Sequence, residues 1–547
     1  MSANPKLVLI GLDGATFRVL HPLVDACVMP TVARFLKEGA SGVLHSTRPP
    51  VTCPAWPTMF TGVNPGKHGV FSFTCRRGKD ARPHTASSLD VRAPTIWELV
   101  GRAGRRVGVM NVPITFPAQP VNGFMVAGFP APAGSGEIIW PRSEYEDAKR
   151  DLPGFVVNWP GVGQRMRTQR EQIQLVESVN ALMRARNRAF EYFLDRHQID
   201  FCYLVFEYPD KVQHRFYPLL ESMNGLAADP YGPVLRLLQD GYREIDAAIG
   251  RLVERFGDDT NYLIVSDHGF GPVRRVMYLN HFLERHGLLA ARHVKAVMAR
   301  ALMHTKLPVG LRSRLGLSQD EPWHRLDTWT SPLIDYPRTR AFTGHQYEHA
   351  VYINEAGKCP QGIVRKGADY ENVRQQVIKA LRQATDPKSG KAIFEGVWPR
   401  EEIYTGPYVE QAPDIIFDLV EGYTVSAGVG LSAFLDGGFL RDSRNSEISG
   451  YHLPEGVFLG YGPAFRAGQN VEATLYDIVP TVLGLMGIEI PDELDGQVIE
   501  GALKPESLTY KSRRHEAAVT REISESSAYT PEEEQEITRR LAELGYL

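Results

Sequence analysis

The chain has 547 residues, of which 43% are hydrophobic and 23% are charged, and its formal net charge is −3. This composition is typical of a globular protein with one large core that carries insertions, or with two or three domains. The charge provides no basic field for holding nucleic acid along an extended surface, so a compact substrate is favoured. The five cysteines are scattered without a CxxC pair, which argues against a disulfide framework and against a thiolate zinc site. We therefore expect a cytoplasmic protein.

The first residues, MSANPKLVLIGLDG, contain one brief apolar run that Gly11 and Asp13 interrupt. This run is shorter than the hydrophobic part of a signal peptide, so we interpret it as a buried strand. Elsewhere Asp, Arg, Gly or Pro breaks each apolar run before it reaches the length that a bilayer requires. We expect no membrane span.

Apolar runs that end in polar residues alternate along the chain with amphipathic patterns. The apolar runs predict strands over residues 6–13, 106–114, 201–210, 261–269, 414–420 and 456–463. Apolar residues at spacings of three and four predict helices over residues 30–39, 95–104, 168–197, 234–257, 370–384 and 475–487. This alternation predicts an α/β fold with a mostly parallel central sheet and helices on both faces.

Two segments depart from this alternation. Residues 114–164 are rich in Pro, Gly and Trp, and residues 285–347 combine a basic helix-like run with aromatic loop sequence. We predict that both are insertions that form a lid or cap near the site, with peripheral packing as the alternative. The rest of residues 1–500 is expected to form one catalytic domain. A charged tail over residues 503–547 is expected to end in a short helix that Thr530 caps.

Acidic side chains follow three of the predicted strands. Asp13 ends the first strand, Asp210 follows the strand that begins at 201, and Asp267 follows the strand that begins at 261. In sheets of this kind, ligands collect beyond the carboxyl ends of the strands. Position and chemistry therefore agree on a candidate site.

Two short motifs add imidazole groups to these carboxylates. A helical turn in DKVQH would place Asp210 and His214 on one face, and Gly269 favours a turn in which Asp267 and His268 both reach inward. Taken alone, the first motif is more often a surface salt bridge, and the second is as often a loop cap. Taken together they favour phosphoryl transfer at two cations, which needs six or seven donors from one fold.

The chain resembles the type I phosphodiesterase and nucleotide pyrophosphatase family of the alkaline phosphatase superfamily. The resemblance is carried, in order between residues 5 and about 500, by VLIGLDG, TCPAWPTMFTGVNPGKHG, EYPDKVQH, VSDHGF, HLPEGVFLGYGPAF and LYDIVPTVLGLMGIEIPDELDG. It implies an alkaline-phosphatase-like αβα sandwich with cap insertions. It also implies a hydrolase that cleaves phosphodiester or pyrophosphate bonds in a small phosphate ester.

By that resemblance, two divalent ions would be held by two groups of side chains: Asp13, Thr52, Asp267 and His268 for one ion, and Asp210, His214 and His452 for the other. Imidazole and carboxylate donors without thiolate suit Zn²⁺, with Mn²⁺ as the alternative. Ligation to a dication would lower the pKa of the Thr52 hydroxyl and make it the nucleophile. The expected intermediate is a phospho-threonine.

Cys53 is a rival nucleophile, because the related sulfatases use a modified cysteine in a CxPxR context. Here the proline follows directly as Pro54 and the arginine is missing, so we interpret Cys53 as a packed apolar residue. His68 and Lys67, in NPGKHG, are placed either at the phosphate or on the surface of a turn.

The chain departs from the family in one place. The nucleotide pyrophosphatases carry a phosphate-binding asparagine four residues beyond the glycine of the HG motif, and Phe73 stands at that position here. Either the Cys53 amide replaces this donor, with Trp56 or Lys67 nearby in sequence, or the substrate differs. The segment GHQYEHAVYIN offers more candidates for the substrate pocket, with a solvated strand edge as the alternative: His345, Tyr347, Glu348 and His349.

Other functions are compatible with the same scaffold. One alternative is a phosphomonoesterase or a phosphonate or sulfate ester hydrolase of the superfamily. A second is an isomerase of the cofactor-independent phosphoglycerate mutase type, but that type uses serine where this chain has Thr52. A third is an idle binding protein, which the presence of every ligand candidate disfavours.

Overall fold

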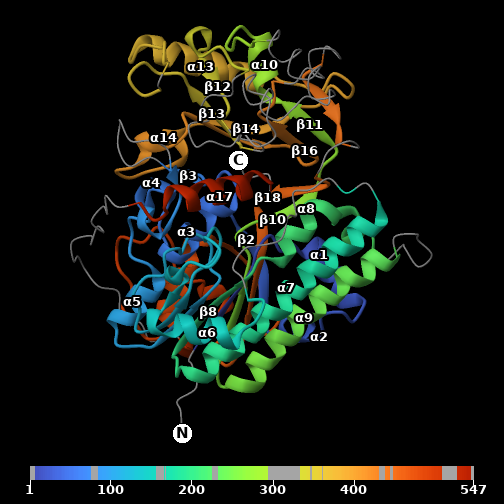
Figure 1. Cartoon of the computed structure of the whole chain (residues 1–547), viewed down its shortest axis with the longest axis vertical. Coiled ribbons are helices and arrows are strands. Elements are labelled where there is room, and N and C mark those ends of the chain that lie inside the picture. Colours follow the sequence, from blue (N-terminus) through green and yellow to red (C-terminus); the bar gives the residue numbers. More distant parts are fainter. Residues whose placement is uncertain are drawn as a thin grey trace.

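The computed structural model shows two units, a larger one and a smaller one above it in Figure 1. The larger unit is called the main unit below and contains the N-terminal strand and the C-terminal helix. The smaller unit, called the cap, is formed by described residues between 275 and 442. The structure describes residues 7–75, 84–155, 166, 168–223, 232–292, 333–344, 348–359, 361–429, 438–443, 448–507 and 527–543.

The main unit is built on a nine-stranded sheet with the order β20-β2-β19-β9-β1-β8-β5-β6-β7. Its strands are β1 (Leu7–Leu12), β2 (Ala40–His45), β5 (Val107–Met110), β6 (Gly123–Val126), β7 (Ile139–Trp140), β8 (Phe201–Phe206), β9 (Asn261–Val265), β19 (Glu455–Tyr461) and β20 (Asn470–Thr474). Strands β9, β1, β8, β5 and β6 run parallel to their neighbours, whereas β19 and β7 are antiparallel. Every residue of β1, β5 and β8 is buried, as expected for strands covered on both faces.

Helices cover both faces of this sheet (Figure 1). One side carries α1 (Phe17–Asp25), α2 (Pro30–Glu38), α7 (Gln169–Arg196), α8 (Tyr208–Glu221) and α9 (Gly232–Phe256). The other side carries α3 (Thr52–Thr61) with α4 (Pro65–His68), α5 (Ile96–Arg102) and α16 (Ile478–Leu485). In α9 the buried residues recur at helical spacing, for example Ile245, Ile249 and Leu252, so one face of the helix packs on the sheet side. The predicted αβα sandwich with a mostly parallel sheet is confirmed.

The cap has a hydrophobic core of its own, which extends from Met277 to Val429. A four-stranded sheet has the order β12-β13-β15-β14, and a three-stranded sheet has the order β16-β11-β17. The strands are β11 (Arg275–Tyr278), β12 (Ala341–Phe342), β13 (Ala350–Ile353), β14 (Phe394–Pro399), β15 (Ile415–Leu419), β16 (Tyr423–Ser426) and β17 (Leu440–Asp442). Helices α10 (Leu279–Arg285), α13 (Ala368–Arg382) and α14 (Arg400–Ile403) belong to the same unit.

A two-stranded ribbon joins the cap to the main unit. It consists of β10 (Gly269–Pro272) and β18 (Gly450–Leu453), which pair antiparallel with Phe270 opposite His452. The chain therefore leaves the main unit directly after His268 and returns directly before His452. Candidate ligands thus flank the cap on both sides in the sequence.

The two segments expected as insertions lie in different units. Described residues of 114–164 supply β6, β7 and α6 (Tyr145–Asp151) at one edge of the main sheet. Described residues of 285–347 lie in the cap, where Ile334 and Phe342 enter its core. A lid role for these segments stays a prediction.

The C-terminal tail packs on the main unit. Helix α17 (Pro531–Glu543) begins after Thr530, whose Oγ accepts a hydrogen bond from the Glu533 amide at 3.2 Å. The Tyr529 hydroxyl donates to the Ala86 carbonyl at 3.2 Å, and its ring stacks on Phe116 at 5.2 Å between centroids. The short strands β3 (Thr74–Cys75) and β4 (His84–Thr85) lie in the main unit, and α17 contacts β4.

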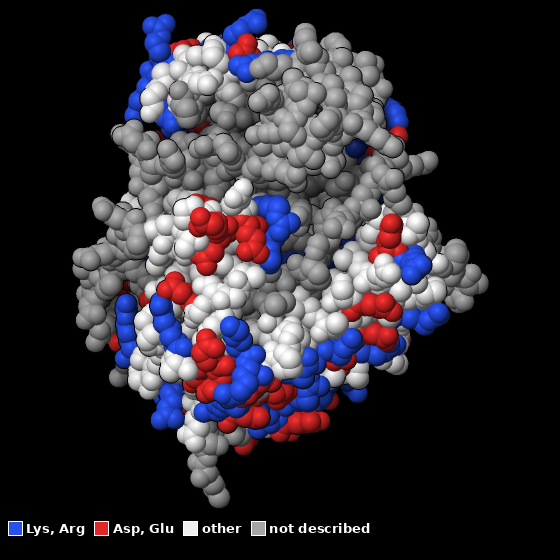
Figure 2. Space-filling model, in the orientation of Figure 1, with Lys and Arg blue, Asp and Glu red and all other residues white. Residues whose placement is uncertain are grey.

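Charges of both signs alternate on the face shown in Figure 2. On α7 and α9 they form pairs such as Arg251 with Glu191 at 3.0 Å and Arg255 with Asp195 at 2.7 Å. Among the described residues no single helix is long and apolar enough to cross a membrane, and α1 and α2, bent by 110°, reach that length only as a pair.

Candidate metal centre

Three carboxylates meet at one edge of the main sheet because they follow neighbouring strands. Strand β1 lies between β8 and β9, so their carboxyl ends lie side by side. Asp13 directly follows β1, Asp267 follows β9 after one residue, and Asp210 lies in the first turn of α8, which begins just after β8. All three side chains are fully buried.

Helix α3 brings Thr52 to the same place. Thr52 is the first residue of this helix, and its Oγ lies 3.2 Å from the Nε2 atom of His268. One turn later, the indole N–H of Trp56 donates to Oδ2 of Asp13 at 3.3 Å. A Cβ atom at Gly11 would lie 2.4 Å from the Trp56 ring, so glycine at this position allows α3 to approach β1.

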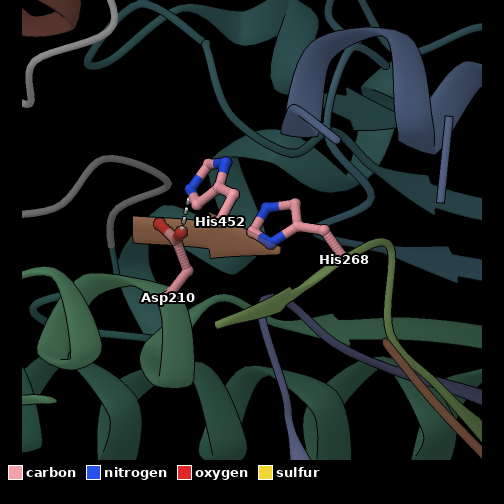
Figure 3. Close-up of side chains that lie close together, drawn as sticks. All are labelled: Asp210, His268 and His452. Carbon is pink, nitrogen blue, oxygen red and sulfur yellow. Dashed lines mark hydrogen bonds and ion pairs between the residues drawn. The ribbon is translucent and has the colours of Figure 1, made fainter. Parts of the chain in front are cut away.

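The ribbon between the units contributes two histidines. His268 directly precedes β10 and His452 lies in β18, and their rings stack at 3.6 Å between centroids. Figure 3 shows Asp210 and His452 facing each other with His268 beside them. The Nε2 atom of His452 lies 3.1 Å from Oδ1 of Asp210.

The histidines of the centre share one hydrogen-bond pattern. In each, Nδ1 faces a backbone carbonyl that can only accept, so Nδ1 carries the proton and Nε2 presents a lone pair to the centre. The acceptors are the carbonyl of Gly450 for His214 at 3.2 Å, that of Gly269 for His268 at 3.1 Å, and that of Pro50 for His452 at 3.1 Å. The Nε2 atoms of His214 and His452 lie only 3.1 Å apart. Two lone pairs at this distance are stabilised by a shared cation.

Two carboxylate oxygens of the centre have no hydrogen-bond donor. Among the described residues, Oδ1 of Asp13 and Oδ2 of Asp267 are buried without a hydrogen-bond partner. Burial raises the pKa of both carboxyls well above the usual range, and the neighbouring carboxylates raise it further. A dication at this point would offset both the burial of the carboxylates and the repulsion between them. The donor set therefore fits a metal site.

The pKa of Asp210 is shifted in the opposite direction from those of Asp13 and Asp267. Burial alone would raise its pKa, but the neighbouring Lys211 ammonium holds that pKa well below the usual range. The Lys211 ammonium donates to Oδ2 of Asp210 at 2.9 Å and lies 5.3 Å from the centre of the Phe129 ring. Asp210 is therefore ready to bind a cation at neutral pH.

The part of the chain that the structure describes holds two groups of candidate ligands. In each group the ligand atoms lie within 4.8 Å of one another: Asp13, Asp267 and His268 in one, and Asp210, His268 and His452 in the other. His214 lies next to the second group, with Nε2 3.2 Å from Oδ1 of Asp210. The structure thus brings together the side chains that the sequence analysis assigned to the site.

A family model described as type I phosphodiesterase / nucleotide pyrophosphatase matches residues 7–451. The chain belongs to this family. As a member of the type I phosphodiesterase / nucleotide pyrophosphatase family, it is a hydrolase of the alkaline phosphatase superfamily. No significant match was found among curated proteins.

Solved structures resemble the chain in fold. Phosphonoacetate hydrolase from Sinorhizobium meliloti 1021, in complex with phosphonoacetate, is 17% identical over 87% of this chain and 95% of its own, with a TM-score of 0.52. Murine ectonucleotide pyrophosphatase / phosphodiesterase 5 is 16% identical over 88% of this chain and 95% of its own, with a TM-score of 0.48.

The position at which nucleotide pyrophosphatases of this family carry asparagine is apolar in this member. Phe73 is buried and packs edge-on against Phe129 at 5.8 Å between centroids. The Lys211 ammonium lies over the face of the Phe129 ring. Sequence reasoning missed Lys211, although its place directly after a candidate ligand in EYPDKVQH was a usable signal.

The other candidates from the sequence lie in several places. Trp56 is completely buried and contacts Asp13, and Lys67 pairs with Asp495 and donates to the Glu493 carbonyl at 3.1 Å. Burial raises the pKa of the Cys53 thiol well above its usual range, which disfavours a thiolate nucleophile. His345 and Tyr347 lie outside the described residues.

Proposed function

We propose that this hydrolase binds two divalent metal ions and cleaves phosphodiester or pyrophosphate bonds of small esters through a phospho-threonine intermediate at Thr52. One observation carries the proposal. The Thr52 hydroxyl lies 3.2 Å from Nε2 of His268, in a buried centre toward which three histidines turn lone pairs and in which two carboxylate oxygens lack a donor among the described residues.

The residues present fit the ions that the family implies. Imidazole and carboxylate donors without thiolate suit Zn²⁺ first and Mn²⁺ second. Asp13, Asp267, His268 and Thr52 would hold one ion, and Asp210, His214 and His452 the other. When bound, the ions lower the pKa of the Thr52 hydroxyl and neutralise charge on the phosphoryl oxygens.

The chain's own residues then position the reaction. Thr52 begins α3, so its amide and that of Cys53 lie in the first helical turn, where no intrahelical carbonyl is available to them. These amides can donate to a phosphoryl oxygen and replace the asparagine that Phe73 displaces. Lys211 keeps Asp210 ionised and adds a positive charge next to the centre.

The reaction has two steps, and both involve the Oγ atom of Thr52. Attack by Thr52 forms the bond from Oγ to phosphorus and breaks the bond from phosphorus to the leaving alcohol, which departs with a proton. Water then attacks phosphorus, breaks the bond to Oγ and restores the hydroxyl. A diester therefore yields an alcohol and a phosphate monoester.

A comparison of chromogenic substrates tests this proposal. Release of p-nitrophenol would be measured from bis-p-nitrophenyl phosphate, p-nitrophenyl phosphate, a nucleotide p-nitrophenyl ester and p-nitrophenyl sulfate, with Zn²⁺ and then with Mn²⁺. We expect metal-dependent release that is fastest on the diesters. Release that a chelator does not affect, or release that is fastest from the sulfate, would refute the proposal.

A cytoplasmic location is part of the same proposal. Cys53, Cys202 and Cys359 are buried, and the sequence contains no CxxC pair. Scattered cysteines of this kind are compatible with a reducing compartment. Fractionation of cells that produce the protein, with a cytoplasmic marker enzyme, would test this.

A further inference from the structure

A cavity of about 410 Å³ lies between the main unit and the cap, beside the candidate metal centre. Both units line it, and His452 forms part of its wall. The lining residues used below are Arg18, His349, Asp418, Glu421 and His452. Its volume suits the organic part of a small ester.

Most of the charge around this cavity is already paired. Arg18 of α1 binds Glu421 of the cap through two hydrogen bonds of 2.7 and 2.9 Å. Nε of Arg48, from the main unit, lies 3.1 Å from Oδ2 of Asp418. These pairs connect the two units. Glu395 and Glu455 also line the cavity, so its lining carries more negative than positive charge, which disfavours a second phosphate group.

His349 differs from these residues because it is a buried polar side chain outside the ion pairs. It directly precedes β13, its side chain is almost completely buried, and its ring lies between Phe417 at 5.5 Å and Tyr451 at 5.6 Å. Neither ring nitrogen has a hydrogen-bond partner among the residues that the structure describes. Buried polar groups in native proteins are nearly always paired, so this exception points to a partner that arrives from outside the chain.

The chemistry of that partner follows from the state of the ring. Burial, with a smaller contribution from the neighbouring His452, lowers the pKa of His349 to about 3. The imidazole is therefore neutral at pH 7 and offers one donor and one acceptor. A hydroxyl group can serve either nitrogen, because it both donates and accepts. An alkyl or aryl group would leave the imidazole unpaired.

Asp418 offers a second contact on the same cavity. Its Oδ1 atom is buried without a hydrogen-bond partner in the described part of the chain, while its Oδ2 faces Arg48. A carboxylate oxygen accepts from a hydroxyl. More than one hydroxyl can therefore be bound in this cavity.

We propose that His349 is a specificity residue that binds a hydroxyl on the organic part of the substrate, and that the substrate is a phosphate ester of a polyol such as glycerol or a sugar. This inference rests on the proposed function and extends it. The metal centre supplies the reaction, and His349 with Asp418 selects the alcohol.

Two esters that differ only in hydroxyl groups test this selection. They are p-nitrophenyl glyceryl phosphate and p-nitrophenyl propyl phosphate, which share a leaving group and a three-carbon chain. A site built around a hydroxyl rejects an analogue without it, so we expect kcat/KM to favour the glyceryl ester by roughly 10²- to 10⁴-fold. Equal kcat/KM values for the two esters would overturn the inference.

The variant His349→Phe separates a binding role from a packing role. Phenylalanine keeps an aromatic ring between Phe417 and Tyr451 but has no polar atom. We expect the preference to fall to within about threefold while kcat/KM on the propyl ester is retained, because only hydroxyl contacts are lost. A variant that keeps the wild-type preference, or that loses both activities in parallel, would contradict the inference. His349→Gln keeps a donor and an acceptor and is expected to restore part of the preference.

A binding measurement keeps this test separate from the proposed function. The thermal shift of Thr52→Ala would be compared with glycerol 3-phosphate and with propyl phosphate, both with and without His349→Phe. We expect glycerol 3-phosphate to raise Tm more, and only when His349 is present. If bis-p-nitrophenyl phosphate is not hydrolysed by the wild type, the proposed function fails, and this Tm difference still decides the role of His349. Equal Tm shifts would overturn it.

Discussion

The metal centre and the cavity beneath the cap lie next to each other but satisfy their polar groups in different ways. In the centre, each histidine is fixed by a backbone carbonyl and turns its other nitrogen toward the same point. In the cavity, paired charges connect the two units, and His349 has no partner among the described residues. The centre fits the cations that we propose for it, whereas the cavity fits the substrate hydroxyl that we propose His349 binds.

The same contrast between the main unit and the cap is seen in two buried histidines, His68 and His349. Burial lowers the pKa of both His68, in the main unit, and His349 to about 3. The Val70 amide donates to Nδ1 of His68 at 3.2 Å, and Nε2 of His68 donates to the Thr58 hydroxyl at 3.0 Å. His68 is therefore a structural residue, although its sequence context allowed a role at the phosphate.

The largest effect is expected from Thr52→Ala in the main unit. Loss of a nucleophile costs on the order of 10⁴- to 10⁶-fold in kcat. Steady-state rates on bis-p-nitrophenyl phosphate would measure it, and Thr52→Ser, which keeps a hydroxyl, is the matched control with a smaller loss. A rate in Thr52→Ala close to that of the wild type would contradict the assignment of chemistry to the main unit.

The next largest effect is expected from Lys211→Met. Removing one partner of a buried ion pair costs about 3 to 5 kcal/mol of unfolding free energy, measured by urea titration. The pKa of Asp210 should also rise, because its nearest cation is gone while its burial is unchanged. The acid limb of the pH profile of kcat/KM should therefore move to higher pH. Lys211→Arg keeps the charge, and an equal shift in that variant would argue against this explanation.

Replacing His68 and His349 separately by phenylalanine tests the difference between these two buried histidines. His68→Phe leaves the Val70 amide and the Thr58 hydroxyl without partners and should cost about 1 to 3 kcal/mol. His349→Phe removes an unpaired polar ring from an aromatic environment and should change the unfolding free energy by less than about 0.5 kcal/mol at pH 7. Equal losses in urea titrations of both variants would mean that His349 is structural as well.

The stability of His349→Phe should also depend on pH differently from that of the wild type. The folded pKa of His349 is about 3, below the ordinary value of 6.5, so between these values the unfolded chain binds a proton that the folded chain excludes. Wild-type stability therefore falls as the pH decreases, by about 2 kcal/mol from pH 7 to pH 5 for this group alone. The variant lacks this loss. Parallel stability curves for the two proteins would contradict the neutral, buried state of His349.

The smallest effect is expected at the contact between the units. Arg18 and Glu421 are each nearly half exposed, with side-chain exposures of 44% and 42%, so their pair should contribute only about 0.2 to 1 kcal/mol. Arg18→Gln should lower the unfolding free energy by that amount at low salt and by almost nothing at about 1 M salt, where the Debye length is short. A loss that salt does not reduce would indicate a packing role for Arg18.

The convergence of several candidate ligands could be predicted from the sequence because their signals are local. Asp13, Asp210 and Asp267 each follow a buried apolar strand, and parallel strands bring such positions to one edge. His214 lies one helical turn after Asp210, and the ligand atoms of the two residues lie 3.2 Å apart in α8. The same strand and helix patterns predicted the mostly parallel sheet with helices on both faces.

The contacts of the cap could not be predicted because they join residues that are far apart in the sequence. Arg18 pairs with a residue 403 positions later, and β13 pairs with β15 across the intervening α13. Nothing near His349 in the sequence shows that neither of its nitrogens has a hydrogen-bond partner among the described residues. The rings that pack against it, Phe417 and Tyr451, are also distant in the sequence.

Metal analysis of the purified, dialysed protein tests whether the buried centre binds two metal ions. We expect two divalent ions per chain in the wild type and a loss of about one ion in Asp210→Asn. Asp246→Asn is the matched control, because Asp246 is also buried but accepts from the Thr31 and Val32 amides at 3.0 and 2.9 Å. It should keep both ions. A wild type without bound metal, or an unchanged metal content in Asp210→Asn, would contradict the account.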